Sequence, residues 1–227
     1  MVQHEIKRRS EQKNRYSGVS IFSSKIKCGE CGNWYGSKVW HSTSKYRKTI
    51  YQCNHKFKND KKCETPHLYE EEIKRAFISA VNKILDNRKE VIKNLELVHK
   101  MLSDSAELEN SEKDLQAEIE VLIGMVQHCI SENASTPQNQ AQYQARYDSL
   151  VDKYETKKTE LDELKNTISD RKARLEILKH FISTLKKQKN LITEFDDTLW
   201  SSLVDYITVF AKDDIRFTFK DGTEIKA

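Results

Sequence analysis

The chain has 227 residues, of which 37% are hydrophobic and 33% are charged. This composition argues against a single large spherical core and predicts an elongated molecule. No apolar run approaches the length of about 18 residues that spans a bilayer, and the N-terminus lacks the apolar segment of a signal peptide. We therefore expect a soluble, cytoplasmic protein without a membrane partner.

Charge is unevenly distributed along the sequence. The formal net charge is +4, but residues 1–62 hold 15 Lys and Arg against 4 Asp and Glu. The remainder of the chain is therefore net negative. A polyanion is the expected partner of the first segment, and a less charged surface is the expected partner of the second.

The N-terminal third predicts a basic linker followed by a small β domain. Residues 1–20 are polar and basic without apolar periodicity, which is typical of an arm that orders on contact with a partner. Residues 21–63 alternate short apolar and aromatic runs with Gly and Cys turns, which is typical of short β-strands: IFSSKIKC, NWYGSKVW and RKTIYQC. Such strands bury too little surface to be stable alone, so a covalent or metal staple is needed.

Four cysteines supply the expected staple: Cys28, Cys31, Cys53 and Cys63. Thiolates at this density predict a tetrahedral, structural Zn²⁺ site, in which the first pair forms a tight turn and the second pair brackets an extended loop. A site that uses His55 or His67, and thiols that are unliganded or in disulfides, are the alternatives. Catalytic zinc is not expected, because there is no HExxH-type motif and four thiolates leave no open coordination position.

A helix is predicted after Pro66. Three glutamates, Glu70–Glu72, favour its N-terminal dipole. One apolar face then recurs at helical spacing and is expected to close over the small sheet: Ile73, Phe77, Ala80, Val81 and Ile84.

The middle of the chain predicts a coiled-coil hairpin over residues 87–190. Heptad-like apolar positions run to about Ser131 and resume from about Tyr143 to Gln188, on either side of the polar tract SENASTPQNQ. Two long helices joined by a loop of about ten residues fold back most simply as an antiparallel pair.

Two irregularities interrupt the heptad pattern. The first arm falls out of phase around Ser103 to Ala106, which predicts a stammer or kink. In the second arm Lys157 and Arg171 are polar breaks in an otherwise apolar seam.

Residues 191–227 predict a short helix, capped by Asp196 or Asp197, and strands around the AKDD and Asp221-Gly222 turns. Because the two ends of a hairpin lie together, these strands can rejoin the zinc-bearing sheet. The predicted fold is α+β: a small zinc-ribbon β domain with a long antiparallel coiled-coil insertion. Its parts are a linker (1–20), a zinc ribbon with a packing helix (21–86), the hairpin (87–190) and a C-terminal helix and strands (191–227).

Three segments carry a resemblance to a known family: FSSKIKCGECGNWYGSKVW, KYRKTIYQC and KKCETPHLYEEEIKRAF. Together with the coiled coil and the Phe/Ile-rich C-terminal strands, they resemble the C-terminal region of large serine recombinases, the family of phage integrases and transposases. In that family this region is a zinc-ribbon DNA-binding domain with a coiled-coil insertion, and a catalytic serine domain precedes it. We expect a bacterial or phage-encoded fragment without that catalytic domain, which is not itself an enzyme.

The resemblance implies three kinds of partner. The zinc ribbon is expected to bind the double-stranded DNA of an attachment site. The coiled coil is expected to contact other recombinase subunits and a directionality factor, and so to regulate synapsis and directionality. The rival hypothesis is a zinc-stapled coiled-coil interaction scaffold that does not bind DNA.

Candidate contact residues follow from side-chain chemistry, because Lys and Arg neutralise phosphates and Arg also reads guanine edges. The candidates for DNA contact are Lys7, Arg8, Arg9, Lys38, His41, Ser42, Lys45, Arg47 and Lys48. For any single lysine a solvated surface is an equally good interpretation. The aromatic side chains of this segment can either stack on DNA or form the core: Trp34, Tyr35, Trp40, Tyr46 and Tyr51.

Candidates for protein contact lie near the predicted turn of the hairpin: Asn139, Gln140, Gln142, Tyr143, Gln144 and Tyr147. The two tyrosines are the better anchors, because aromatic rings supply contact area at a low cost in entropy. A plain spacer is the alternative role of the hairpin.

Overall fold

The computed structural model describes residues 20–57 and 62–227. Lys7, Arg8 and Arg9 and almost all of the predicted linker lie outside these residues. The chain divides into two compact units, which are described separately. The first comprises the described residues up to His99 together with Glu176–Ala227, and the second is Lys100–Leu175.

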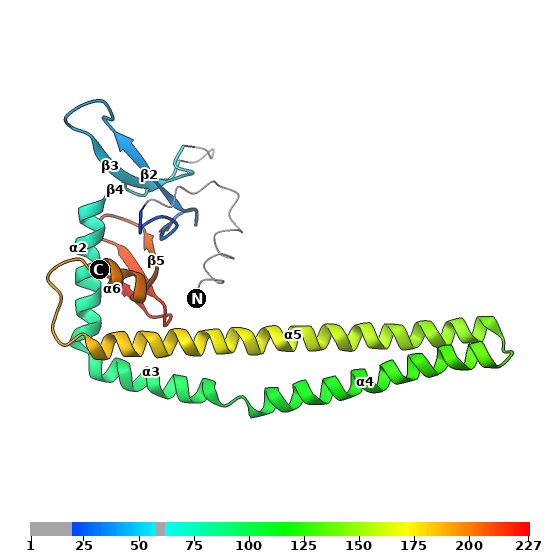
Figure 1. The fold of residues 1–227 in the computed structure, drawn as a ribbon. Helices are drawn as coiled ribbons and strands as arrows, with labels where there is room; N and C mark the ends of the chain where they lie inside the picture. Colours follow the sequence, from blue (N-terminus) through cyan, green and yellow to red (C-terminus); the bar gives the residue numbers. More distant parts are fainter. Residues whose placement is uncertain (1–19, 58–61) are drawn as a thin grey trace. The chain divides into compact units, whose positions relative to one another are not determined.

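The first unit contains two small sheets rather than one (Figure 1). The antiparallel sheet consists of β2 (Tyr35–Trp40), β3 (Lys48–Cys53) and β4 (Leu68–Tyr69). The second sheet has the order β1-β5-β6-β7, formed by Ile26–Cys28, Val204–Val209, Ile215–Phe219 and Glu224–Lys226. The mixed α+β class predicted from the sequence is confirmed.

The C-terminal strands meet the N-terminal part of the chain at β1. Strand β5 pairs with β1 in parallel, from Ile26–Ile207 to Cys28–Val209. The C-terminal strands do not extend the β2-β3-β4 sheet, because the turn after Cys28 redirects the chain before β2 begins. An isolated bridge between Lys27 and Trp34 links the two sheets.

Helix α2 (Glu70–Asp86) buries the apolar face that the sequence predicts. The Glu72 carboxylate accepts a hydrogen bond from the backbone N–H of Tyr69 (2.8 Å) and so helps to cap the helix. Helix α6 (Asp197–Leu203) is capped by Asp196, whose carboxylate accepts from Leu199 N (2.5 Å). Aromatic rings from four segments form the core: Phe22, Phe77, Phe195, Trp200 and Phe217.

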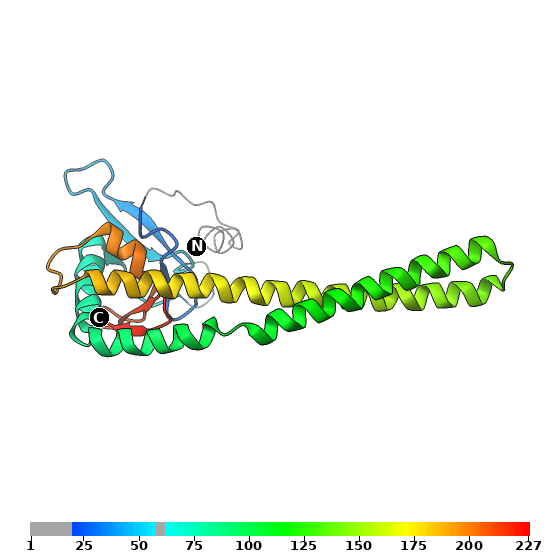
Figure 2. The ribbon, with the colours of Figure 1, turned by 60° about the horizontal axis from the view of Figure 1, so that its bottom comes forward.

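Three helices carry the heptad pattern: α3 (Arg88–Ser103), α4 (Ala106–Ser135) and α5 (Gln140–Lys187). Only Asp104 and Ser105 separate α3 from α4, so the kink predicted between Ser103 and Ala106 is confirmed. Figures 1 and 2 show α4 and α5 running side by side. The pairing is antiparallel, since Arg146 forms a salt bridge with Glu132 near the turn (2.9 Å) and Lys157 forms one with Glu118 further from it (3.0 Å).

The turn between α4 and α5 is shorter than the predicted ten residues. It spans residues 136–139, because both helices extend into the polar tract. The side-chain oxygen of Asn139 accepts from the N–H groups of Ala141 (2.9 Å) and Gln142 (3.3 Å). An N-terminal cap of this kind starts α5 directly after the turn.

The second compact unit, Lys100–Leu175, is shorter at both ends than the predicted hairpin range of 87–190. The last turns of α5 belong with the sheets, since Phe181 is fully buried and its ring lies 6.4 Å from that of Phe219 in β6. Lys186 also pairs with Glu96 of α3 (2.6 Å). Among the described helices, none is both long and apolar enough to cross a membrane.

Candidate metal centre and nucleic-acid interface

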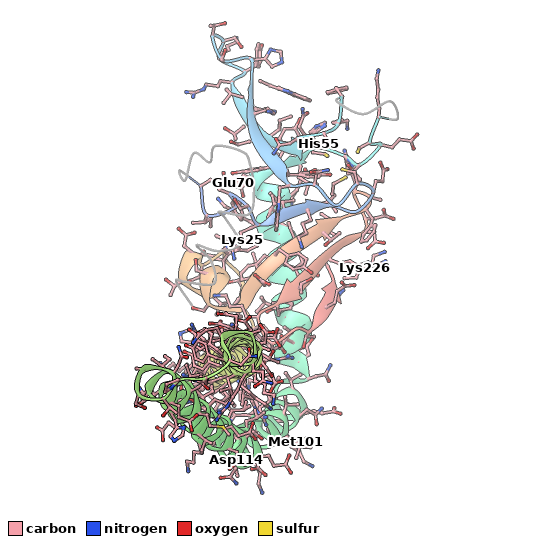
Figure 3. The ribbon with its side chains drawn as sticks, turned by 90° about the vertical axis from the view of Figure 1, so that its right-hand side faces the viewer. Lys25, His55, Glu70, Met101, Asp114 and Lys226 are labelled. Atoms are coloured by element: carbon pink, nitrogen blue, oxygen red, sulfur yellow. The ribbon has the colours of Figure 1, made fainter. Side chains whose placement is uncertain are left out.

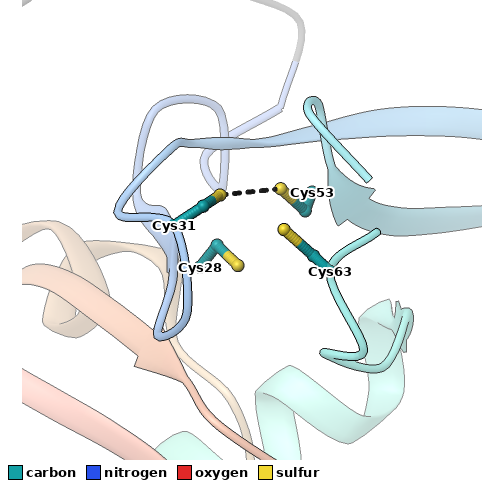
Figure 4. Close-up of side chains that lie close together, drawn as sticks. All are labelled: Cys28, Cys31, Cys53 and Cys63. Carbon is teal, nitrogen blue, oxygen red and sulfur yellow. Dashed lines mark hydrogen bonds between the residues drawn. The ribbon is translucent and has the colours of Figure 1, made fainter. Parts of the chain in front are cut away.

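The four clustered cysteines come from three separate segments that the fold brings together (Figure 4). Cys28 ends β1, Cys53 ends β3, and Cys63 lies in the segment before β4. Between Cys28 and Cys31 the chain makes a tight turn, in which Gly32 N donates to Cys28 O (2.9 Å). Gly32 has a φ of 69°, a conformation that side chains disfavour, so glycine suits this position.

The geometry fits a tetrahedral zinc ion. All four sulfur atoms lie within 4.8 Å of one another, and Cys31 Sγ and Cys53 Sγ are 3.4 Å apart. Zinc–sulfur bonds of about 2.3 Å place tetrahedral sulfurs about 3.8 Å apart, so small adjustments accommodate the ion. All five cysteines of the described residues are free thiols in this structure, as metal ligation requires.

Neither His55 nor His67 belongs to the sulfur cluster. The backbone N–H of His55 donates to Cys53 Sγ (3.4 Å), and the His67 ring lies against Trp40, with 4.7 Å between ring centroids. The donor set is therefore four thiolates, as the sequence predicts. Such a set leaves no open coordination position, and the cofactor is a structural Zn²⁺ ion.

The surroundings of the sulfurs favour the thiolate form of Cys31 and oppose that of Cys53 and Cys63. Burial raises the pKa of Cys31, but hydrogen bonds from the Asn33 backbone and from Cys53 outweigh it, and the pKa falls to about 7. Burial raises the pKa of Cys63 to about 11 and also raises the pKa of Cys53. The charge of a bound cation is what makes four neighbouring thiolates compatible.

Hydrogen bonds outside the ligand set join the two halves of the metal site. Thr65 Oγ1 lies 3.2 Å from Cys28 Sγ, and the Glu64 backbone N–H donates to the Glu30 carboxylate (2.8 Å). Contacts of this kind orient metal ligands and tune their basicity. They make residues 62–65 part of the metal centre although the loop before them is long.

The C-terminal strands also contact this centre. Gly29 N donates to Val209 O (2.8 Å), and a Cβ at Gly29 would lie 2.4 Å from the Phe210 ring. Glycine is therefore required for the close approach of the β5–β6 turn to the first cysteine pair.

The predicted DNA contacts of the described residues gather on one β-hairpin. Lys38 lies in β2, Lys48 begins β3, and the others lie in the connection between these strands: His41, Ser42, Lys45 and Arg47. All six are exposed. His41 has a φ of 53° and its carbonyl accepts from Ser44 N (3.0 Å), so this residue also shapes the turn.

The structure sorts the aromatic candidates. Tyr35 and Tyr51 are core residues, with 4% and 2% of their surface exposed. Trp34 is half-buried beside Tyr206, with the Lys27 ammonium near both rings. Trp40 and Tyr46 remain on the surface, 40% and 63% exposed. These two are the aromatic rings of the hairpin that a partner can contact.

Sequence reasoning missed two residues that lie beside the hairpin. The sequence suggests His67 only as a zinc ligand and gives no role to Tyr69, yet the His67 ring lies between those of Trp40 and Tyr69. Tyr69 pairs with Ile50 of β3 through the short strand β4. No local sequence signal predicts a two-residue strand, so this placement emerges only from the structure.

The candidates for protein contact, at the turn between α4 and α5, have different environments. Asn139 caps α5, the Gln140 side chain donates to Asn133 (3.1 Å), and Gln144 donates to Asp148 (2.7 Å). Tyr143 and Tyr147 are half-buried, with ring centroids 6.0 Å apart. Gln142 is exposed.

Comparison with known proteins finds a family match for the zinc-binding segment. Residues 21–82 match the family described as the recombinase zinc beta ribbon domain. No curated protein matches the sequence. The chain is also similar to a chain in a crystal structure of a large serine recombinase (LSR)–DNA complex, at 13% identity and a TM-score of 0.34. The match covers 96% of this chain and 61% of that chain, so this chain spans about three fifths of its length.

Proposed function

We propose, from the match of residues 21–82 to the recombinase zinc beta ribbon domain, that the chain is the DNA-binding and synapsis-regulating part of a serine site-specific recombinase. The zinc ribbon binds the double-stranded DNA of the attachment site. A zinc ribbon is not a catalytic domain, and a site closed by four thiolates supports a structural role for the metal. DNA cleavage would belong to a catalytic serine domain of the parent recombinase, and the chain itself would be no enzyme.

One observation carries the proposal: a group of four exposed basic residues lies together on the β2–β3 hairpin. Lys38, Lys45, Arg47 and Lys48 are within one short ribbon that the metal centre anchors through Cys53 at the end of β3. Clustered cations of this kind neutralise DNA phosphates and release counterions. Loss of zinc is therefore expected to remove the DNA-binding surface.

The test measures binding of the full chain to a labelled mixed-sequence DNA duplex over a series of salt concentrations. The proposal expects binding that weakens steeply with salt, since each phosphate contact contributes about 0.9 to the slope of log K against log salt. Treatment with a zinc chelator should abolish the binding. Binding that is flat in salt, or that survives complete removal of zinc, would contradict the proposal.

We infer for the hairpin of α4 and α5 that it contacts other recombinase subunits and a directionality factor. Exposed polar side chains at the turn, such as Gln142, and the half-buried Tyr143 and Tyr147 support this assignment. Replacing both Arg47 and Lys48 with alanine distinguishes the DNA-binding function from the competing scaffold hypothesis. DNA affinity should fall if the ribbon binds DNA, whereas a scaffold has no salt-dependent affinity to lose.

The free thiols also bear on location. Five free cysteines in the described residues are typical of a reducing compartment. We therefore propose that the chain acts in the cytoplasm of a bacterium, where it is chromosomally or phage encoded.

A further inference from the structure

The β2–β3 hairpin separates its charged and neutral side chains by the pleat of the strands. The register pairs Trp40 with Lys48, Lys38 with Ile50 and Val39 with Thr49. Directly paired residues of an antiparallel sheet lie on the same face, and successive residues of a strand lie on opposite faces. Figure 3 shows the side chains of this hairpin projecting to both sides.

One side, here named the basic face, carries the lysines and three aromatic rings: Lys38, Trp40, Lys48, His67 and Tyr69. The other side, here named the neutral face, carries Ser37, Val39 and Thr49 where it is exposed. The two lysines of strands β2 and β3 thus lie on one face, although they are ten positions apart in the sequence.

Ring contacts hold the basic face in a fixed arrangement. The Trp40 ring lies 4.7 Å from that of His67, and the His67 ring lies 5.4 Å from that of Tyr69 at 90°. The Lys48 ammonium lies 5.7 Å from the Tyr69 ring centroid. Ile50, which pairs with both Lys38 and Tyr69 and lies on the same face, is completely buried. A surface that is ordered before binding loses little entropy when a partner docks.

Charge next to the basic face does not oppose an anionic partner strongly. Glu70 and Glu71 follow Tyr69 in the sequence, but both carboxylates pair with the Lys74 ammonium (2.9 and 3.2 Å). The third glutamate, Glu72, is engaged at the start of α2. The lysines therefore set the sign of the potential over the outer part of the ribbon.

We propose that the basic face, rather than the neutral face, is the surface that the ribbon presents to double-stranded DNA, with Trp40 as its central apolar contact. The inference rests on the proposed function. Beyond the residues that β4 covers, the hairpin is a ribbon of two strands, and the major groove of B-DNA admits a ribbon of this width. Lys38 and Lys48 contact phosphates, and the exposed part of Trp40, supported by His67, packs on the sugar–phosphate backbone.

The test compares alternate residues of the same two strands, since the side chains of neighbours point to opposite faces. It measures fluorescence anisotropy of a labelled mixed-sequence duplex with the full chain over a series of salt concentrations. Three substitutions on the basic face are each matched by one on the neutral face: Lys38→Ala with Ser37→Ala, Trp40→Ala with Val39→Ala, and Lys48→Ala with Thr49→Ala.

Each lysine substitution should lower the salt slope by about 1, the value for one lost phosphate contact. Trp40→Ala should weaken binding by about tenfold with little change in the slope, because the lost contact is apolar and not ionic. The matched substitutions should leave affinity and slope within about twofold of the parent chain. Zinc content and circular dichroism confirm that each variant is folded.

A further variant, His67→Ala, tests the support of the Trp40 ring. Binding should weaken, while zinc content stays at one ion per chain because His67 is not a ligand. Loss of zinc in this variant would overturn the assignment of His67 to the basic face.

A failure of the proposed function can be distinguished from a failure of the present inference. If the parent chain does not bind the duplex in a salt-dependent way, the proposed function fails. If the parent chain binds but the neutral-face variants lose as much affinity as the basic-face variants, only the present inference is overturned. The same holds if single strands of the probe bind more tightly than the duplex and Trp40→Ala affects only them, since Trp40 would then stack on bases.

Discussion

Arg171 of α5 is expected to stabilise the break between α3 and α4. Its guanidinium donates to the backbone carbonyl oxygens of Met101 (3.2 Å), Leu102 (2.7 Å) and Asp104 (2.6 Å). The last carbonyl groups of a helix lack partners within the helix, and a cation near them is favourable. Arg171 therefore satisfies the groups that the end of α3 leaves open.

The substitution Arg171→Met removes the charge and all three donors but keeps an apolar stem in the seam. Hydrogen bonds to a charged group contribute about 1.5–3 kcal/mol each when buried, but two of these three are exposed to water. Allowing for solvent, we expect the opening of residues 101–108 to become easier by about 1–2 kcal/mol in total.

The assay is native-state hydrogen exchange of backbone amides in the full chain. Since 1.4 kcal/mol corresponds to a factor of ten, amides near the break should exchange about 5 to 30 times faster in Arg171→Met. The control is Arg174→Met, which changes an exposed arginine of the same helix. Unchanged exchange in the first variant, or an equal increase in the control, would refute this reasoning.

Three further predictions concern other parts of the chain. Gly29→Ala should lower the free energy of unfolding by about 1–3 kcal/mol, because the added Cβ would lie 2.4 Å from the Phe210 ring. Thermal melts should show that the double variant with Phe210→Ala recovers part of this loss. Additive losses would argue against the contact. Removal of zinc should unfold the ribbon but leave α4 and α5 helical, because these helices supply no ligand to the metal site. Circular dichroism should show loss of the near-ultraviolet tertiary signal, with most of the far-ultraviolet helical signal retained. A complete loss of the helical signal would contradict the prediction. Asn139→Ala should destabilise the hairpin by about 1 kcal/mol through loss of the cap on α5, whereas Asn139→Asp should preserve it; equal melting temperatures of the two variants would count against the cap.

Local sequence patterns were sufficient for the features that depend on neighbouring residues. The heptad phase shift predicted the break at Asp104 and Ser105, and the cysteine spacing predicted the metal site. The apolar face of α2 is also read directly from helical periodicity. These features follow from the geometry of one segment at a time.

Features that depend on register between distant segments were not predictable in the same way. Arg171 is a break in the apolar seam when only its own helix is considered, but it lies opposite the end of α3 in the folded hairpin. Likewise the pairing of β1 with β5 and the stacking of His67 on Trp40 require knowledge of which strands are neighbours. A one-residue change of register would place Trp40 on the other face of the ribbon.

The contacts around the first cysteine pair show why zinc alone does not determine the fold of the ribbon. β1 has three residues, and β5 is the strand with which it pairs. Cys28 is in register with Val209, and Gly29 donates to the carbonyl of Val209. The ligand Cys28 and the start of the turn after it are thus positioned by residues that follow the coiled-coil hairpin in sequence. Because metal affinity depends on how far the ligands are positioned before the ion binds, the C-terminal strands contribute to zinc binding as well as to the core.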